Sequence, residues 1–342
     1  KPFDPEELQH VVDRAIERRH LLQENRDLKT EVSSKYRFEN IIGSSAAMQS
    51  VFGLISKGAP TNSTVLITGE SGTGKEVIPR AIHYNSLRKD QPFVTVDCNT
   101  LSENLLESEL FGHVKGSFTG AVANKRGMFD IANNGTLFMD EFGNIPLSTQ
   151  AKLLRVIQER EFRPVGSTTS QKTNVRLITA TNKDLKAMVA EGTFREDLYY
   201  RVNVFPIHAP PLRERRDDIP ALTFHFLKLF CAELERPVLE ISEAAMSMLS
   251  GYDWPGNVRE LQSTVQRAVI LASDNVIHQA HLVNIIEALP KPDMEVPRNS
   301  EELKRIKKQV REKSVEDVEK LFIQETLKRN DFNVTKSAEE TG

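Results

Sequence analysis

Residues 64–76 read Thr64-Val-Leu-Ile-Thr-Gly-Glu-Ser-Gly-Thr-Gly-Lys-Glu76, and this stretch decides the fold of the chain. Its β-branched start predicts a buried parallel strand up to Thr68, followed by a glycine-rich turn and by a helical pattern from Lys75. A strand, a Gly-x-x-x-x-Gly-Lys turn and a helix form the layout of a phosphate-binding P-loop. We therefore predict that backbone N–H groups of the turn cradle phosphate oxygens, and that Lys75 reaches the β and γ phosphates.

The residues of this turn are the predicted nucleotide contacts. They are Gly69, Glu70, Ser71, Gly72, Thr73, Gly74, Lys75 and Glu76. Glycines are needed because the chain must curl at positive φ and approach the anion closely. Glu76 stands where most P-loops carry Ser or Thr for Mg²⁺, so we expect any effect of Glu76 on the metal to be indirect. A chance glycine turn is the alternative, and the strand before it argues against that interpretation.

The overall composition excludes several classes of protein. A chain of 342 residues holds about two or three domains. Its formal net charge of −3 does not favour a basic nucleic-acid binder, and it has neither an apolar run that could span a bilayer nor a visible signal peptide. Cys98 and Cys231 offer no disulfide framework and no metal-ligand cluster. We expect a cytoplasmic protein with no membrane partner, and a fragment of a longer chain.

The N-terminal region predicts one long helix. Asp4 is a helix cap with Pro5 at the first helical position, and the helical pattern continues to about Val32. Four positions of this helix alternate in spacing between four and three residues: Leu21, Asn25, Leu28 and Val32. This spacing is typical of a coiled-coil seam with one polar residue that fixes the register. The run is short, so an ordinary amphipathic linker helix is an equally good interpretation.

From Ile41 onward, strands alternate with helices. An amphipathic helix is predicted from about Ala46 to Lys57. After the P-loop strand, four further strands are predicted at Phe93–Val96, Gly135–Glu141, Val175–Thr181 and Val202–Ile207. The alternation predicts a parallel, doubly wound α/β sheet. Strand patterns stop after Pro211, and several helices are predicted up to Leu289. Pro79, in the P-loop helix, removes a backbone hydrogen bond that a helix interior would need.

An acidic pair ends the predicted strand Gly135–Glu141. Met139-Asp140-Glu141 has the form of a Walker B element, in which Asp140 holds Mg²⁺ directly or through water and Glu141 polarises the attacking water. Phosphoryl transfer depends mostly on positioning and charge neutralisation, so a carboxylate pair beside a P-loop suits it. Two acidic residues that cap the next helix are the alternative interpretation, which the P-loop disfavours.

Several long motifs occur in a fixed order. They are Gly69–Glu76, Glu107-Ser-Glu-Leu-Phe-Gly-His113, Gly116-Ser-Phe-Thr-Gly-Ala121, Phe194-Arg-Glu-Asp-Leu-Tyr-Tyr-Arg201 and Trp254-Pro-Gly-Asn-Val-Arg-Glu-Leu261. In this the chain resembles the AAA+ domain of the NtrC-type sigma-54-dependent transcription activators, closely over residues 38 to 289 and more loosely in the flanks. The resemblance implies a P-loop ATPase that binds ATP and Mg²⁺, with a C-terminal helical lid. It also explains Glu76, because the P-loop of that family ends in Lys-Glu.

The resemblance suggests a division of the chain. Lys1-Pro2-Phe3 resembles the end of a bacterial phosphoreceiver domain, which would place the parent protein in a two-component system. Residues 322 to 342 resemble the first helices of a Fis-type helix-turn-helix, without the recognition helix. The expected parts are 1–37 (receiver end and helical linker), 38–217 (α/β ATPase subdomain), 218–289 (helical lid), 290–314 (linker) and 315–342 (truncated helix-turn-helix).

The resemblance also implies roles for single residues. Asn182 matches sensor I, Arg259 matches sensor II of the lid, and Ile42 lies in the segment that contacts adenine. Arg195 and Arg201 match arginine fingers that enter the neighbouring subunit's site. The chemistry supports this, because the charge that develops on the transferred phosphoryl group needs cations. A surface salt bridge is the ordinary interpretation of a lone Arg.

The Gly116–Ala121 loop is the predicted contact with sigma-54. Its residues are Gly116, Ser117, Phe118, Thr119, Gly120 and Ala121, with Ser117 where the family usually carries Ala. Glycines at both ends predict a mobile hinge, and an exposed aromatic on such a loop is typical of a partner anchor. A tight turn that packs Phe118 on its own domain is the alternative. A second insertion, around Glu161 to Lys172, resembles the loop that moves beside it.

Asp97 is a second departure from the family pattern. Many members carry Asn at this position, where it hydrogen-bonds the Walker B Glu. Asp97 near Glu141 would either repel it or share a proton, which raises one pKa. The sequence equally allows Asp97 to point elsewhere.

These features together predict an ATPase that remodels the sigma-54 closed promoter complex. By resemblance it forms a homo-oligomeric ring of about six or seven subunits, with a dimer as a possible inactive form and enhancer DNA as a partner of the whole protein. A rival hypothesis is a DNA-binding regulator whose AAA+ domain is an oligomerisation switch without sigma-54 activation. A third is a remodelling ATPase with a different client.

Overall fold

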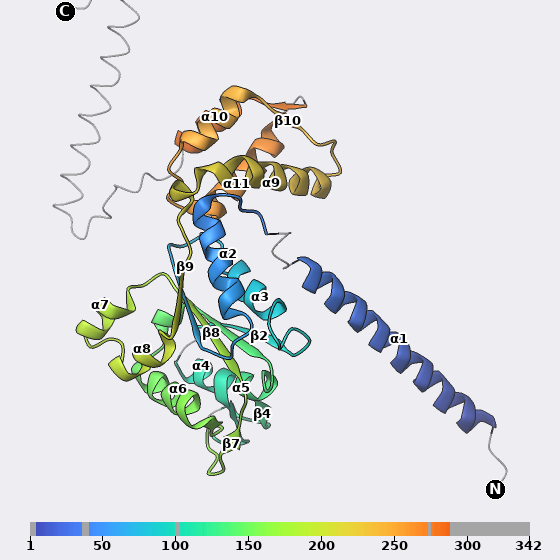
Figure 1. The fold of residues 1–342 in the computed structure, drawn as a ribbon. Coiled ribbons are helices and arrows are strands. Elements are labelled where there is room, and N and C mark those ends of the chain that lie inside the picture. The colour runs from blue at the N-terminus through green and yellow to red at the C-terminus, as the bar shows by residue number, and fades with distance from the viewer. Residues whose placement is uncertain (1–4, 36–40, 100–102, 119, 273–274, 288–342) are drawn as a thin grey trace, which may run out of the picture. The chain divides into compact units, whose positions relative to one another are not determined.

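A computed structural model describes residues 5–35, 41–99, 103–118, 120–272 and 275–287 of the chain. Five parallel strands form its central sheet, in the order β2-β5-β8-β1-β9 (Figure 1). Their bounds are β1 Val65–Thr68, β2 Phe93–Asp97, β5 Thr136–Asp140, β8 Arg176–Thr181 and β9 Phe205–His208. The chain leaves β1 for the far edge at β2 and returns through β5 and β8 to β9. The end of β1 therefore lies where the strand order reverses, which is where parallel sheets bind ligands.

Helices cover both faces of this sheet. Successive side chains of a strand point to opposite sides, so each face carries apolar side chains that a helix layer buries. On one face, Val65 and Ile67 pack with α2 (Ala46–Gly58) and α3 (Val77–Tyr84). On the other face, Leu66 belongs to a cluster that includes residues of five helices. These are α4 Glu103–Phe111, α5 Met128–Ile131, α6 Leu147–Glu159, α7 Leu185–Ala190 and α8 Glu196–Val202. Each fully buried Val, Leu or Ile contributes roughly 1.5–3 kcal/mol. The predicted doubly wound α/β sheet is confirmed.

A helical subdomain follows β9. It contains η3 Leu212–Glu214, η4 Arg216–Asp218, α9 Ile219–Glu233, α10 Glu243–Gly251, α11 Asn257–Leu271 and α12 Gln279–Glu287. These helices share a core of their own around Trp254, which is 0% exposed and donates a hydrogen bond from Nε1 to the Leu249 carbonyl at 2.8 Å. The predicted helical lid is confirmed. One detail differs, because two short strands, β10 (Glu240–Ile241) and β11 (Val276–Ile277), pair in parallel within it.

Two short antiparallel hairpins extend from the sheet subdomain. One joins β3 (Gly112–His113) to β4 (Lys125–Arg126), and the other joins β6 (Glu161–Phe162) to β7 (Gln171–Lys172). A parallel bridge connects them. The Val165 N–H donates to the Gly112 carbonyl at 2.8 Å, and the Val165 carbonyl accepts from the Val114 N–H at 3.1 Å. The two insertions recognised in the sequence therefore contact each other.

Two element boundaries differ from the sequence prediction. The P-loop helix α3 begins at Val77 instead of Lys75. A helix from Lys75 would need the N–H of Pro79 for the Lys75 carbonyl, and proline has none. With the later start, Pro79 is the third residue of α3, in the first turn, where N–H groups lack intrahelical partners. The last strand begins at Phe205, and Val202 instead ends α8.

Several predictions lie partly or wholly outside the described residues. The N-terminal helix is confirmed as α1 (Pro5–Lys35), but of the predicted seam only Leu21 has a described side chain, which is 58% exposed. The cap Asp4, residues 1–3, the linker 290–314 and the segment 315–342 are not described. The compact unit that holds the sheet and the lid ends at Ile286.

Candidate active site

The P-loop leaves the carboxyl end of β1 with three glycines at positive φ: Gly69 at 151°, Gly72 at 76° and Gly74 at 90°. The backbone N–H groups of residues 70 to 76 donate to no acceptor among the residues that the structure describes. Buried or loop N–H groups are normally paired, so an unbroken run of free donors is a place for an anion. The loop therefore presents a row of free N–H donors with the chemistry of an anion site.

Lys75 is held inside this loop. Its side chain is 7% exposed, and Nζ donates to the carbonyls of Gly69 at 2.8 Å and Glu70 at 2.9 Å. Burial lowers the pKa of Lys75, while the nearby charges of Glu141 and Asp140 act in the opposite direction. The ammonium group is thus confined between the loop and the two carboxylates that end β5.

Asp140 is the last residue of β5, and Glu141 follows it outside the strand. The Glu141 N–H donates to Asp140 Oδ1 at 2.8 Å, and Glu141 itself lies at φ 49°, in the left-handed region. Such a conformation costs a non-glycine residue of order 1–3 kcal/mol and clusters at functional sites. Burial raises the pKa of Asp140, and the charges of Glu76 and Asp97 raise it further. A cation beside Asp140 would remove this penalty.

The donor set around Asp140 fits Mg²⁺ only together with a phosphate. Among the described residues, no three His, Cys, Asp or Glu side chains converge as a metal cage. Mg²⁺ characteristically takes one or two carboxylates and completes its shell with water and substrate phosphates. Asp140, beside the free amides of the P-loop, offers that arrangement.

Asp97 lies beside Asp140 in the sheet, since these two residues are paired in the β2–β5 register. Its carboxylate accepts a hydrogen bond from the Asn99 N–H at 2.8 Å, and it lines a small cavity of about 190 Å³ with Asp140 and Glu76. The charge of Asp97 therefore acts on Asp140 in this structure, whereas the sequence prediction concerned Glu141.

An apolar cavity of about 380 Å³ adjoins the P-loop at Thr73 and Gly74. Ile41, Ile42 and Phe226 contribute to its lining, so both the N-terminal segment and the lid form its walls. An apolar cavity next to a phosphate cradle has the right chemistry for a nucleotide base. Ile42, predicted to contact adenine, is among the residues that line this cavity.

The lid contacts the P-loop directly. Arg259 Nη1 donates to Ser71 Oγ at 3.3 Å, and the positive charge of Arg259 helps to lower the pKa of Lys75. Arg259, the predicted sensor II residue, thus contacts the P-loop of its own chain.

Asn182 is exposed at the carboxyl end of β8, whose last residue, Thr181, is paired with Thr68 at the end of β1.

The two predicted arginine fingers are not part of this constellation. Arg195 forms a two-pronged ion pair with Asp197, at 3.0 and 2.7 Å. Arg201, in the last turn of α8, is exposed and forms no ion pair with any residue that the structure describes. No contact of a described residue joins either arginine to the P-loop of its own chain.

The Gly116–Ala121 loop closes on itself. The Gly116 N–H donates to the Ala121 carbonyl at 2.8 Å, and Ala121 N–H donates to the Phe118 carbonyl at 3.0 Å. Phe118 is 38% exposed and meets the His113 ring edge-on, with centroids 5.0 Å apart. The ring is therefore partly packed on its own domain and partly available. Thr119 lies outside the described residues.

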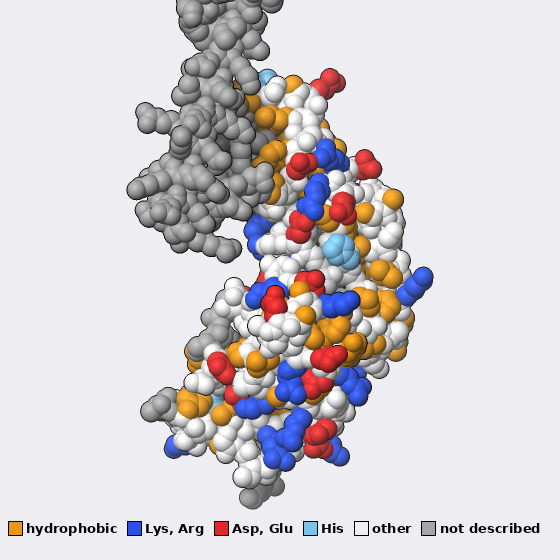
Figure 2. Space-filling model, turned by 90° about the vertical axis from the view of Figure 1, so that its left-hand side faces the viewer, with side chains coloured by type: hydrophobic (Ala, Val, Ile, Leu, Met, Phe, Trp, Pro, Cys, Tyr) orange, Lys and Arg blue, Asp and Glu red, His pale blue; other side chains and the backbone are white. Residues whose placement is uncertain are grey.

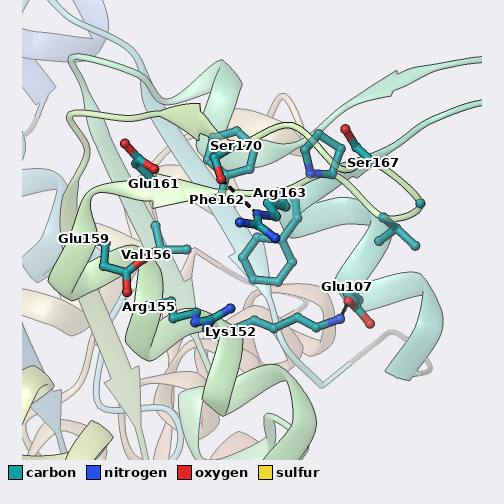
Figure 3. A pocket seen from close by; sticks show the side chains of 14 residues that line it. Glu107, Lys152, Arg155, Val156, Glu159, Glu161, Phe162, Arg163, Ser167 and Ser170 are labelled. Atoms are coloured by element: carbon teal, nitrogen blue, oxygen red, sulfur yellow. Dashed lines mark hydrogen bonds and ion pairs between the residues drawn. The ribbon is translucent and has the colours of Figure 1, made fainter.

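The second insertion lies beside this loop. A Cβ built on Gly166 would come within 2.5 Å of the Ser117 Cβ, so the two loops touch there, and Ser117 Oγ is buried without a partner among the described residues. Below them, a cavity of about 380 Å³ opens between α4, α6 and the β6–β7 hairpin (Figure 3). Lys152 of α6 bonds Glu107 of α4 across it, and Arg163 donates to Ser170 at 2.9 Å. The β6–β7 loop thus rests on a polar cavity.

Two family models match the chain. Residues 41–208 match the Sigma-54 interaction domain, and residues 213–296 match the AAA+ ATPase lid domain. Over 340 residues, the chain is 45% identical to the regulatory protein AtoC of Escherichia coli, which is 99% of this chain and 72% of AtoC. The chain belongs to the NtrC-type sigma-54-dependent transcription activators.

Other similar proteins agree with this family membership. The Nif-specific regulatory protein of Herbaspirillum seropedicae is 54% identical over 267 residues, covering 78% of this chain and 49% of that protein. The crystal structure of NtrX from Brucella abortus has a TM-score of 0.71 at 35% identity and covers all of this chain and 73% of NtrX. NtrX has also been crystallised with ADP and with ATP. The chain spans about half of the Nif-specific relative.

The surface and the helices of the chain add two observations. Acidic and basic side chains are interspersed over the face shown in Figure 2, without a patch of one sign. Among the described residues, no helix combines the length and apolarity needed to cross a membrane.

Several residues of the site were not identified from the sequence. Asp218 is 0% exposed and accepts hydrogen bonds from Ser44 N at 2.6 Å and Ser45 N at 2.8 Å, which fixes the start of α2 to the lid. Arg213, Arg215 and Asn257 hold the P-loop from the lid side. Asn257 was within a recognised motif, and the two arginines follow Pro211 in a Leu-Arg-Glu-Arg run; neither pattern points to the P-loop.

Proposed function

We propose that the chain is the ATP-hydrolysing part of a ring-forming activator, which remodels the sigma-54 RNA polymerase closed complex through its Gly116–Ala121 loop. The observation that carries this proposal is the convergence of free P-loop amides, Lys75, Asp140, Glu141 and Arg259 in one site. The membership of a sigma-54 activator family, together with the ATP complex of its relative NtrX, supports ATP as the ligand.

The site accounts for the parts of ATP separately. The apolar cavity beside Ile42 takes the adenine, and the amides of residues 70 to 76 take the phosphates with Lys75 and Arg259. Asp140 would hold Mg²⁺ directly or through water, with Glu76 acting on it only through its charge; the ion supplies positive charge to the phosphate oxygens. The positive groups and the amides thus neutralise the charge of the phosphates, and the apolar cavity excludes water from the base.

Glu141 is the group that acts on water. Its left-handed backbone turns the residue out of the strand at the edge of the phosphate cradle. There its carboxylate would accept a hydrogen bond from the attacking water and orient the water toward the γ-phosphate, while Asn182 at the end of β8 would contact that phosphate. Lys75 would stabilise the charge that develops on the leaving oxygens.

We further propose that the active site is shared between subunits. Arg195 and Arg201 are exposed on or next to α8 and do not contact the P-loop of their own chain. An exposed cation that a neighbour's ATP could recruit makes hydrolysis depend on assembly. This supports a homo-oligomeric ring. The proposed division of the chain keeps the predicted ATPase subdomain (38–217) and lid (218–289), but moves the start of the lid back to η3, because Leu212 belongs to the lid core. It reserves enhancer binding for the whole protein.

The loop carries the contact with sigma-54 in this proposal. Gly116 and Gly120 lie at φ 83° and 103°, and a Cβ at either would meet no atom within 4 Å, so no neighbouring atoms pack against these two positions. The Phe118 ring meets the His113 ring edge-on and remains 38% exposed. A partly exposed aromatic between two unpacked glycines suits an anchor for a protein partner.

The test compares two exposed phenylalanines. Phe118→Ala should hydrolyse ATP within a few-fold of wild type but lose co-migration with sigma-54 in ADP and a metal fluoride, because an anchor aromatic is worth ~2 kcal/mol or more. Phe224→Ala, on α9 and 46% exposed, is the matched control and should keep both activities. Wild type that never binds sigma-54 would favour a DNA-binding regulator with an AAA+ switch. Phe118→Ala that binds normally would show that the ring only packs internally.

A further inference from the structure

The P-loop contains a carboxylate of its own. Glu70 follows the first glycine of the loop, where an approaching phosphate would meet a like charge. In the structure this charge is neutralised from the lid, since Arg213 Nη1 and Nη2 donate to the two oxygens of Glu70 at 2.8 and 2.6 Å. Asn257 Nδ2 adds a third hydrogen bond at 3.1 Å. Arg213 is the main reason that the pKa of Glu70 falls to about 2, so the carboxylate stays ionised and paired.

The lid also holds the backbone of the loop. The Ser71 carbonyl accepts from Asn257 Nδ2 at 3.0 Å, and the Gly72 carbonyl accepts from Val258 N at 2.9 Å, in the first turn of α11. The Thr73 carbonyl accepts from Arg215 Nη2 at 2.6 Å. Three consecutive loop carbonyls are therefore bound by lid residues.

This pattern fixes the direction of the phosphate-binding donors. In a trans peptide, the carbonyl of one residue and the N–H of the next point in opposite directions. When the lid binds the carbonyls of residues 71 to 73, the N–H groups of residues 72 to 74 are turned away from the lid. These are among the amides with no acceptor among the described residues. A Cβ on Gly74 would meet no atom within 4 Å, so there is space beside them.

Asn257 has the chemistry for its double role. It lies at φ 54°, a region that Asn tolerates better than most residues, and its side chain is 0% exposed. Its Oδ1 accepts from the Leu212 N–H at 2.7 Å while Nδ2 serves Ser71 and Glu70. Gly72 permits this approach, because a Cβ there would lie 2.3 Å from the Gly256 carbonyl oxygen.

We propose that Arg213 and Asn257 are positioning residues for nucleotide binding: Arg213 cancels the charge of Glu70, and Asn257 orients the loop amides. The inference rests on the proposed ATP site and adds that an undocked lid leaves a P-loop with an uncompensated carboxylate and unfixed amides. Nucleotide affinity then depends on lid docking even before any lid side chain touches the nucleotide.

The test is a mutant cycle on ADP affinity, measured by calorimetry with the full 342-residue chain. Arg213→Met should weaken ADP binding about tenfold or more, because the Glu70 carboxylate is left unpaired and repels the phosphates. In a Glu70→Gln background, Arg213→Met should weaken ADP binding by less than about threefold. Arg213→Lys should bind ADP more tightly than Arg213→Met but less tightly than wild type, since it keeps the charge and loses the two-pronged contact.

Two further variants separate the roles. Asn257→Gly keeps the left-handed backbone but loses the Ser71 contact, so its loss of about tenfold should persist in the Glu70→Gln background. Arg216→Met is the matched control, because Arg216 is a lid arginine of similar exposure, 46% against 41%, whose partner is Asp253 instead of the P-loop. It should bind ADP like wild type.

The outcomes distinguish this inference from the proposed function. If Arg213→Met costs the same with and without Glu70, then Arg213 acts on the nucleotide directly and the inference is wrong. Full ADP affinity in Arg213→Met and Asn257→Gly would also overturn it, while the ATPase assignment would stand. If wild type itself fails to bind ADP, both the proposed function and the inference fall.

Discussion

Two glycine-bounded loops in this molecule use glycine for opposite purposes. In the P-loop, a Cβ on Gly69 would lie 2.7 Å from the Ala209 carbonyl oxygen, and one on Gly72 would lie 2.3 Å from that of Gly256. In the Gly116–Ala121 loop, a Cβ on Gly116 or Gly120 would meet no atom within 4 Å. Gly69 and Gly72 of the first loop are needed because neighbouring backbone approaches closely, whereas the glycines of the second loop are needed only for their positive φ. Close packing suits a site that must hold a fixed geometry, whereas freedom suits a segment that moves.

The largest expected effect divides binding from chemistry within the first loop. Lys75→Ala should abolish measurable nucleotide binding, because it removes the cation that the loop encloses. Glu141→Gln should bind ATP normally and lose about 10²–10⁴-fold in kcat, because only water activation is affected. Calorimetry and single-turnover hydrolysis measure the two quantities. An equal loss of ATP affinity in both variants would contradict the assignment.

A second prediction concerns the arginines that lie apart from both loops. Arg201→Ala should still bind ATP but lose turnover by about 10³-fold or more, as removal of an arginine finger does. Mixed with Lys75→Ala, it should regain part of the activity, since one subunit then supplies Arg201 to the intact P-loop of another. Steady-state ATPase rates of mixtures test this. Mixed rings that form and stay inactive would exclude a role between subunits.

A third prediction tests the comparison directly with one substitution in each loop. Gly72→Ala should destabilise the docked lid by roughly 3 kcal/mol or more, because it adds a backbone clash to a φ of 76°. Gly120→Ala carries only the cost of its φ of 103°, about 1–2 kcal/mol. Thermal unfolding and ADP affinity should fall clearly in the first variant and little in the second. Equal effects would mean that the two loops do not differ in packing.

The sequence predicts much of the first loop and less of the second. Lys75, Asp140 and Glu141 follow from motifs, since a buried strand that ends in a glycine turn or an acidic pair has few alternatives. The bond from Arg213 to Glu70 joins residues 143 positions apart, and no local pattern announces such a pair. The start of α3 at Val77 was predictable in principle from Pro79.

The structure also decides details that the second loop's sequence left open. The sequence marks Phe118 as an aromatic without a core role. Its contact with the His113 ring depends on how the chain turns from β3 into the loop, and only the structure shows that turn. The family resemblance places the two insertions beside each other, but no spacing in the sequence shows that Ser117 and Gly166 are the residues in contact. Glycine positions in the sequence therefore locate both loops, but only the surrounding backbone shows which one is tightly packed.

The smallest expected effect comes from Ser117, at the one place where the mobile loop is packed. Its hydroxyl is buried without a partner among the described residues, and its Cβ lies against Gly166. An unsatisfied buried hydroxyl costs about 1–3 kcal/mol, while its removal leaves the contact with Gly166 in place. Ser117→Ala should therefore raise the unfolding temperature by about 2–4 °C and leave the ATPase rate unchanged.

The same substitution should leave sigma-54 co-migration unchanged or improve it, because alanine keeps the loop seated while removing the unpaired group. Gly166→Ala is the informative companion, since its new Cβ would push against Ser117 and should be tolerated less well alone than together with Ser117→Gly. If Ser117→Ala instead weakens co-migration at an unchanged unfolding temperature, then the hydroxyl has its partner outside the chain. In that case Ser117 contacts sigma-54 itself, and the packed end of the loop belongs to the moving surface.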